Sequence, residues 1–206
     1  MRVHDDWQLT PQRVAVHLPT GTAVLSDLHL GYDQARRRRG EAVPACGVGA
    51  ALAPLAAVFE QCSARAVLIA GDLFEDGAHE AVVDELLGWL RQRGAELLGV
   101  VPGNHDRRLA TVAHSIPVLA GGFRLGRWRV IHGDGVLATG RMVCGHFHPA
   151  VRLAGQVRPC YLVGERQIVL PAFSRDARGG TPAWGRGYRR LVPVGSDVLD
   201  FGPAPR

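Results

Sequence analysis

Residues 22–29 read Thr-Ala-Val-Leu-Ser-Asp-Leu-His, an apolar run that ends in two residues able to bind a metal ion. Four later apolar runs end in the same way. They lead into Gly71-Asp72, Gly103-Asn104-His105-Asp106, His132-Gly133-Asp134 and Gly145-His146-Phe147-His148. One such segment is weak evidence, but five in this order indicate a site that holds two metal ions side by side. Because the segments follow apolar, strand-like runs, their side chains would converge on one edge of a sheet.

The donor atoms indicate the kind of metal. Imidazole nitrogens, carboxylate oxygens and one amide oxygen suit Mn²⁺, Fe or Zn²⁺, whereas an all-oxygen site would suit Mg²⁺ or Ca²⁺. Asp27 and His29 are two residues apart, so both side chains would point to one side at the end of a strand. The pair His146 and His148 repeats this spacing. Asp72 stands alone, and a carboxylate has two oxygens with which it can bridge two cations.

The hydrophobic pattern predicts the fold class. In the first half, strands are expected over 14–18, 22–26, 66–70 and 96–101, and helices over 48–62 and 79–93. After Ser115 the pattern changes to short strands separated by Gly and Pro. We therefore expect an α/β fold, a four-layer α-β-β-α sandwich in which two mixed sheets pack face to face with helices outside. A length of 206 residues predicts a single domain over 1–206.

Composition excludes several other classes. The chain is 47% hydrophobic, and no apolar stretch approaches the roughly 20 residues of a membrane span. Its first residues show no signal-peptide hydrophobic region. The four cysteines, at positions 46, 62, 144 and 160, form no C-x-x-C pair. We expect a cytoplasmic protein with reduced cysteines and no membrane association.

The net charge is +5, and every basic side chain other than histidine is Arg. The densest cluster is Arg36 to Arg39 (Arg36, Arg37, Arg38 and Arg39), which follows Asp27 and His29 closely. Arginines near the mouth of the site would attract a polyanion and match its phosphates. Arg107 and Arg108, after the Gly-Asn-His-Asp motif, add to this charge. The alternative is that the run is an ordinary solvated face in an arginine-rich chain.

The order D-x-H, G-D, G-N-H-D, H-G-D and G-H-x-H resembles the calcineurin-like metallophosphoesterase superfamily. The motifs cover residues 22–148. Ser-Asp-Leu-His-Leu-Gly-Tyr from Ser26, the stretch from Arg36 to Gly40 and the tail Val169 to Ser174 with Gly179-Gly180 are similar to a narrower group. These are the small bacterial ligase-associated DNA-damage-response phosphoesterases of the PdeM type, relatives of the Mre11 nuclease.

The resemblance implies a role for each site residue. One metal would be held by Asp27, His29 and His148, the other by Asn104, His132 and His146, and Asp72 would bridge them. His105 would lie beside the metals as general acid or as a stabiliser of charge on the phosphate. Glu75, three residues after Asp72, could orient His105 by a hydrogen bond. Asp106 and Asp134 would either fix the orientation of the ligands from outside the metal site or simply cap turns.

The resemblance also implies the reaction. It would be metal-dependent hydrolysis of phosphoric esters, most of all phosphodiesters, by a hydroxide that two divalent ions share, with Mn²⁺ expected first. The implied substrate is single-stranded or damaged DNA, in a repair system with a DNA ligase or helicase. Two alternatives stay open. One is a small-molecule phosphodiesterase or phosphatase for nucleotides or cyclic nucleotides, and the other is a non-catalytic metal-binding scaffold, against which the intact ligand set argues.

Overall fold

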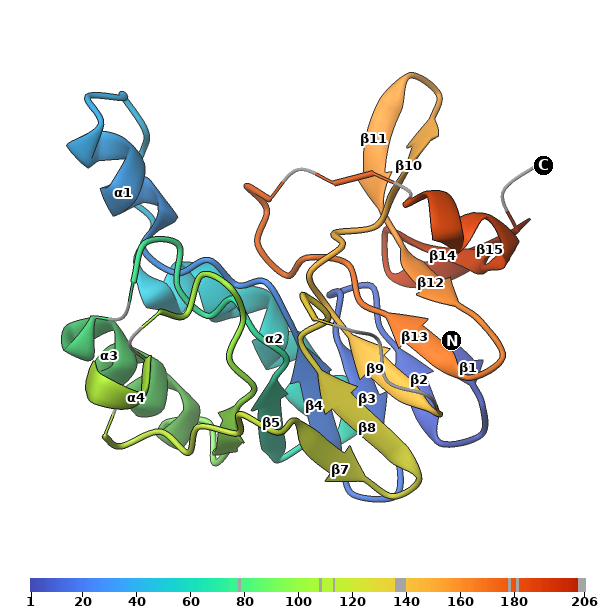
Figure 1. Cartoon of the computed structure of the whole chain (residues 1–206), viewed down its shortest axis with the longest axis horizontal. Helices are drawn as coiled ribbons and strands as arrows, with labels where there is room; N and C mark the ends of the chain where they lie inside the picture. The colour runs from blue at the N-terminus through green and yellow to red at the C-terminus, as the bar shows by residue number, and fades with distance from the viewer. Residues whose placement is uncertain are drawn as a thin grey trace.

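The computed structural model consists of two mixed β-sheets that pack face to face, with α-helices on one side (Figure 1). It describes residues 1–77, 79–107, 109–112, 114–135, 140–177, 179–180 and 182–203. The order of strands in the first sheet is β1 (Arg2–Val3), β2 (Trp7–Leu9), β3 (Ala15–His17), β4 (Thr22–Leu25), β5 (Ala66–Ile69) and β6 (Glu96–Val100). Strands β4, β5 and β6 run parallel, whereas β1 to β4 are antiparallel.

The second sheet also combines parallel and antiparallel pairs. Its order is β15 (Asp197–Pro203), β14 (Arg189–Val194), β12 (Tyr161–Val163), β13 (Gln167–Val169), β9 (Met142–Cys144), β8 (Trp128–Ile131) and β7 (Phe123–Leu125). Strands β8, β9 and β13 are parallel. A separate hairpin of β10 (Ala150–Leu153) and β11 (Gln156–Pro159) projects from this part of the molecule (Figure 1). The carboxyl ends of the parallel strands in each sheet lie at one edge, which is where the motifs follow them.

The core has a layer on each face of the first sheet. Ala23 and Leu25 of β4 face the helices, whereas Val24 faces the second sheet, as the alternation of side chains along a strand requires. Between the sheets, Trp7 and Trp128 are fully buried and make an edge-to-face contact with ring centroids 5.9 Å apart. Strands such as β4, buried on both faces, explain the continuous apolar runs that precede the motifs.

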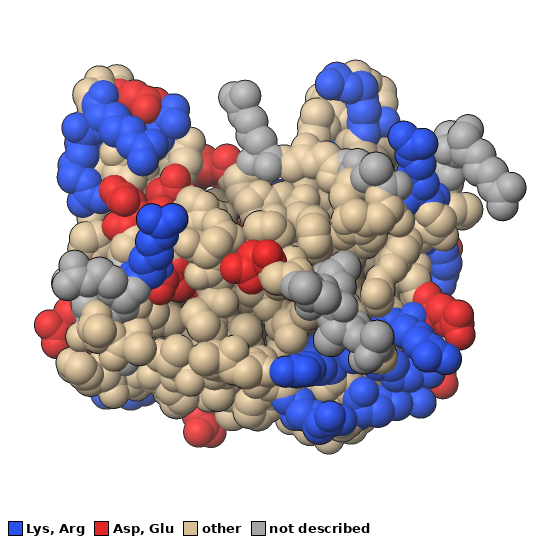
Figure 2. Space-filling model, viewed as in Figure 1, with Lys and Arg blue, Asp and Glu red and all other residues tan. Residues whose placement is uncertain are grey.

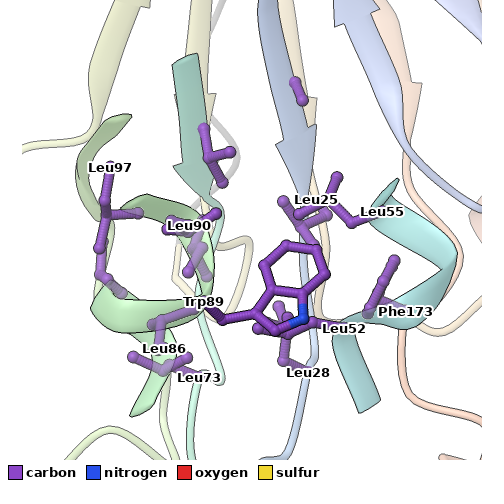
Figure 3. Close-up of a cluster of buried hydrophobic side chains, with 14 of the residues drawn as sticks. Leu25, Leu28, Leu52, Leu55, Leu73, Leu86, Trp89, Leu90, Leu97 and Phe173 are labelled. Atoms are coloured by element: carbon purple, nitrogen blue, oxygen red, sulfur yellow. The ribbon is translucent and has the colours of Figure 1, made fainter. Parts of the chain in front are cut away.

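Two helices cover the outer face of the first sheet. These are α2 (Val48–Cys62) and α3 (Glu80–Arg91), which match the expected helices over 48–62 and 79–93 closely. Figure 3 shows Trp89 of α3 reaching in among Leu25, Leu52 and Leu55. The chain leaves α3 at Gly94, whose φ of +62° lets the amide of Ala95 bond to the carbonyl of Leu90.

The predicted α/β sandwich of two mixed sheets is confirmed. In the part of the chain that the structure describes, the far face of the second sheet is covered by Tyr188, by the start of β10 and by the short 3-10 helix η1 (Ala183–Gly187). No helix within the described ranges has the length and apolarity that a membrane crossing needs.

Several elements were not expected from the sequence. They include α1 (Tyr32–Arg38), α4 (Leu109–Val112) and the strands β1, β2 and β15. Strands β1 and β2, of two and three residues, are too short to show periodicity, and β15 buries only Val198. Helix α1 has only Asp33 and Ala35 buried, so it has no apolar stripe that would predict it.

Candidate metal centre

Five loops meet at the carboxyl ends of parallel strands from both sheets. They follow β4, β5 and β6 of the first sheet and β8 and β9 of the second. Helix α1 begins three residues after His29, and β10 begins two residues after His148. In Figure 1, α1 and the β10–β11 hairpin therefore project on either side of the region where the loops meet. The sequence expectation that the motif residues converge on one sheet edge agrees with this arrangement.

The loops after β4 and β5 run side by side. The amide of Asp27 donates to the carbonyl of Gly71 at 2.9 Å, and the amide of His29 donates to the carbonyl of Asp72 at 3.0 Å. Leu30 and Phe74 continue this pairing as an isolated parallel bridge. Asp27, His29 and Asp72 are thus fixed relative to one another by the backbone.

Asp27, His29 and His148 form a first cluster, here called the Asp27 group. Their ligand atoms all lie within 4.8 Å of one another. Nε2 of His148 is 3.2 Å from Oδ1 of Asp27, and both carboxylate oxygens of Asp27 accept from the backbone amide of His146 at 3.1 Å. Asp27 is fully buried, so its charge demands a cationic partner.

Asp72, Asn104, His132 and His146 form the second cluster, here called the His132 group. Ligand atoms of Asp72, His132 and His146 lie within 4.8 Å of one another. Oδ1 of Asn104 is 3.1 Å from Nδ1 of His146 and 3.3 Å from Nε2 of His132. On its other side, His132 uses Nδ1 to donate to the carbonyl of Ala70 at 2.9 Å, so that Nε2 faces Asn104 and Asp72.

The backbone at these residues is strained. Ten residues other than Gly have positive φ in the described part of the chain, and five of them belong to the two clusters. Those five are Asp27 (56°), His29 (48°), Asp72 (50°), His146 (68°) and His148 (42°). Left-handed backbone costs energy for residues with a Cβ and gathers at functional sites. The expected reason for the pairing of Asp27 with His29, alternation along a strand, is therefore wrong, because β4 ends at Leu25.

His105 lies beside both clusters. Its amide donates to Oδ1 of Asp72 at 2.9 Å, and its Nδ1 donates to the backbone carbonyl of Glu75 at 2.9 Å. The expected orienting bond from Glu75 is thus made by the main chain, whereas the Glu75 carboxylate lies 2.9 Å from Nδ1 of His29. His29, Glu75 and His105 also bring their ligand atoms within 4.8 Å of one another. Glu75 therefore positions two imidazoles. Its main-chain carbonyl contacts His105 and its carboxylate contacts His29.

Two further carboxylates of the motifs differ in their surroundings. Asp106 is buried and accepts from the amides of Gly103 (2.9 Å) and Phe74 (3.1 Å), so it ties the loop after β6 to the loop after β5. Asp134 is exposed. Cys144 does not join the ligands, because its side chain lies in the apolar cluster on the far face of the second sheet and burial raises the pKa of its thiol to about 12.

The arginines expected near the site occupy α1 and the turn after Asp106. Arg36 pairs with Glu41, Arg38 lies 3.3 Å from Asp76, and Arg37 donates to the carbonyl of Val43 at 2.8 Å. Arg39 caps the end of the helix. Arg107 is exposed, and Arg108 lies outside the described residues.

The protonation of His29, His132 and Asp72 follows from burial and from the contacts of Asp72. Burial lowers the pKa of His29 and favours the neutral imidazole that binds metals. Burial alone would also lower the pKa of His132, but the Asp72 carboxylate outweighs it and raises the pKa to about 9. Conversely, burial would raise the pKa of Asp72, but His132 and the His105 amide outweigh it and lower the pKa. The proton that the pair holds is the one a cation would replace.

The residues fit two divalent cations. Nε2 of His29 is buried and makes no hydrogen bond with any described residue, as a nitrogen reserved for a metal would. The Asp27 group and the His132 group each bring together imidazole and carboxylate donors, and Asn104 adds an amide oxygen. Such mixed donor sets suit Mn²⁺, Fe and Zn²⁺.

A substitution at Gly103 tests how closely the loop after β6 packs against Asp72 and His132. A Cβ there would overlap the Asp72 carboxylate and the His132 ring. We expect Gly103→Ala to weaken Mn²⁺ binding about 10- to 100-fold, the usual cost of disturbing residues around a metal ligand. Titration calorimetry measures the affinity. The matched control is Gly88→Ala in α3, where a Cβ meets nothing within 4 Å. Equal affinity for all three proteins would contradict the packing.

Comparisons with known proteins agree with this geometry. The model of the Calcineurin-like phosphoesterase family matches residues 21–152, more than half of the chain and all five motifs. The fold is similar to the crystal structure of Pseudomonas putida nuclease MPE, with a TM-score of 0.74 and 21% sequence identity over 98% of each chain. No curated protein sequence matches the chain significantly.

Proposed function

This chain belongs to the calcineurin-like phosphoesterase family, and we propose that it is a phosphodiesterase that uses two metal ions to cleave nucleic acid. The family makes it a metal-dependent phosphoric ester hydrolase. The observation that carries the finer proposal is the adjacency of the two clusters. Asp72 belongs to the His132 group through its carboxylate and is bonded to His29 of the Asp27 group through its carbonyl.

Each cluster would hold one ion. The Asp27 group would bind the first, Asn104, His132 and His146 would bind the second, and the Asp72 carboxylate would contact both. Two such ions lower the pKa of water toward neutrality and offset negative charge on a phosphate. Mn²⁺ is our first choice for both, because His, Asp and Asn donors match it.

His105 is the residue proposed to donate a proton to the leaving group or to stabilise charge on the phosphate. Its main-chain bond to Asp72 and its Nδ1 bond to Glu75 leave Nε2 as the ring atom that can face a substrate. A protonated Nε2 could donate to the departing oxygen or to a phosphoryl oxygen. Glu75 would hold both His105 and His29 in position.

A nucleic-acid substrate is supported by charge and by the structural neighbour. Figure 2 shows basic side chains over α1 and over the β10–β11 hairpin, the two elements that project beside the site. Those of the hairpin are Arg152 and Arg158, both exposed. The protein of similar fold is by name a nuclease. Arginines on both sides of the site would attract a polyanion and bind its phosphates.

The narrower resemblance of Ser26 to Tyr32, Arg36 to Gly40 and the tail Val169 to Ser174 supports a further proposal. The chain would act in the cytoplasm on single-stranded or damaged DNA, together with a DNA ligase or helicase. In the structure the tail lies against the site, because the amides of Phe173 and Ser174 donate to the carbonyls of Ser26 and Asp27.

A small-molecule phosphodiesterase or phosphatase is the second candidate. It is favoured by a cavity of about 420 Å³ beside His29, here called the His29 cavity. Its size is that of a pocket for a nucleotide-sized ligand. A cyclic nucleotide or a free nucleotide would then be the substrate, and the arginines of α1 would be a solvated face.

A panel of substrates with added Mn²⁺ distinguishes the two candidates. We expect hydrolysis of single-stranded DNA and of bis(p-nitrophenyl) phosphate, with little activity on a phosphomonoester. Changing Arg36 to Arg39 together to Gln should lower activity on DNA far more than on the small diester, and activity on DNA should fall steeply with salt. Equal losses on both substrates would refute the nucleic-acid proposal, and hydrolysis of the cyclic nucleotide alone would establish the second candidate.

A further inference from the structure

Two cavities adjoin the Asp27 group. The His29 cavity contains His29, and a second cavity of about 430 Å³, here called the His148 cavity, contains His148. Arg175 lines both, so the loop after β13 separates them. The cavities are similar in size and both adjoin ligands of the same proposed metal.

Their charges differ. The His29 cavity is lined by the carboxylates of Asp33, Glu85 and Asp176. Among the described residues that line the His148 cavity there is no Asp or Glu, and its charged side chains are Arg13 and Arg175. Of the two cavities, the second is electrostatically better suited to an anion.

Arg13 reaches the His148 cavity from a distant part of the chain. It lies in the turn between β2 and β3, with a φ of 64°. The turn is closed by a bond from Oγ1 of Thr10 to the carbonyl of Val14 at 2.9 Å. From the second sheet, the buried hydroxyl of Tyr161 donates to the carbonyl of Thr10 at 2.7 Å. A turn fixed from both sides holds Arg13 in place before any ligand binds.

Within the described residues, only one nitrogen of the guanidinium makes hydrogen bonds. This nitrogen donates to the carbonyls of Ser174 (2.9 Å) and Ala172 (3.3 Å), and this anchors the loop that carries Arg175. Burial lowers the pKa of Arg13, and the positive charge of Arg175 lowers it further. Two arginines that repel each other at one cavity are stabilised by an anion between them, and a guanidinium binds phosphate with paired N–H groups.

We propose that the His148 cavity binds a second phosphate group of the substrate, beside the phosphodiester that is cleaved. This inference rests on the proposed function and deepens it, because it requires a substrate with at least two phosphates. The second phosphate is either the next internal phosphate of a nucleotide chain or a terminal phosphate. Arg13 and Arg175 are then specificity residues that select a nucleotide chain over an isolated diester.

The test compares a substrate that carries one phosphate with substrates that carry two. The substrates are thymidylyl-thymidine, its terminally phosphorylated form and the trinucleotide with two internal phosphates. We expect the wild-type protein to prefer the two-phosphate substrates in kcat/KM. Arg175→Gln should reduce this preference about 10-fold, the effect of losing one charge-assisted hydrogen bond. The substrate whose advantage is lost identifies the internal or the terminal phosphate as the ligand.

Arg175 is the residue of choice because it is exposed, so its substitution spares the fold. The matched control is Arg166→Gln, an exposed arginine in the turn that precedes β13, at the opposite end of the strands. The preference should survive in the control. An unchanged preference in Arg175→Gln, or an equal loss on all three substrates, would overturn the inference.

Failure of the proposed function would look different. The wild-type protein would then hydrolyse none of the three substrates. Binding of a fluorescein-labelled trinucleotide to the same proteins, followed by anisotropy, still tests the cavity. Arg175→Gln should raise its Kd about 10-fold relative to Arg166→Gln, and equal Kd values would refute the phosphate site.

Discussion

Asp72→Asn is expected to lower kcat for bis(p-nitrophenyl) phosphate at least 10³-fold, about 4 kcal/mol of activation free energy, while the protein remains folded. The substitution keeps the shape of the side chain and removes its charge. The buried Asp72 carboxylate lies 3.4 Å from Nε2 of His132, and its second oxygen accepts from the His105 amide at 2.9 Å. An amide oxygen can keep the second contact, but a neutral side chain cannot bridge two cations as a carboxylate does.

The measurement needs activity, metal content and stability together. Activity is recorded with saturating Mn²⁺, bound metal by mass spectrometry and the fold by circular dichroism during thermal unfolding. Asp76→Asn is the control, because Asp76 lies in the same loop but is exposed and pairs with Arg38 on the surface. If Asp72→Asn were fully active with added Mn²⁺, the two-metal reading of the site would be wrong.

The sequence predicted the structure best where metal-binding residue types directly follow a buried strand. Strands β4, β5 and β6 are largely buried, so their apolar runs stand out and the proposed ligands that follow them are easy to place. The convergence of the motifs on one edge follows from the parallel direction of those strands. Strands β1 and β15 and helix α1 lack such runs, because they bury few side chains.

The geometry inside the site was less predictable. The left-handed backbone at Asp27 and His29 was not predicted, and it occurs where the loops after β4 and β5 pair. The two-residue spacing suggested that the side chains of Asp27 and His29 lie on one side of a strand. The backbone has a different geometry, but it also brings these two side chains into one cluster. In the same way, Glu75 was expected to orient His105 through its carboxylate, and a pattern of side chains cannot reveal that a main-chain carbonyl does so.

Residues that reach the site from outside the motifs leave no local signal. Arg13 contacts the carbonyl of Ser174 across a separation of 161 positions, and the turn that carries Arg13 is bonded to Tyr161 of the second sheet. The tail Val169 to Ser174 was noticed through its resemblance to relatives. In the structure, the amides of Phe173 and Ser174 in this tail donate to the carbonyls of Ser26 and Asp27.

His105→Gln is expected to lower kcat about 10²- to 10³-fold on thymidylyl-thymidine, within the usual range for loss of a general acid. The departing thymidine oxygen is strongly basic and needs a proton as its bond to phosphorus breaks. The nitrophenolate of bis(p-nitrophenyl) phosphate is a weak base and leaves without one. If His105 is the acid, the same substitution should therefore cost much less on the chromogenic diester.

The ratio of the two losses separates an acid from a charge stabiliser. A residue that only stabilises charge on the phosphoryl oxygens would affect both substrates similarly, because those oxygens are the same in each. His114→Gln, a change at an exposed histidine outside the five motifs, serves as the control and should leave both rates unaltered. Equal losses on both substrates would assign His105 to charge stabilisation. Full activity on thymidylyl-thymidine would exclude His105 from the chemistry, despite its bonds to Asp72 and Glu75.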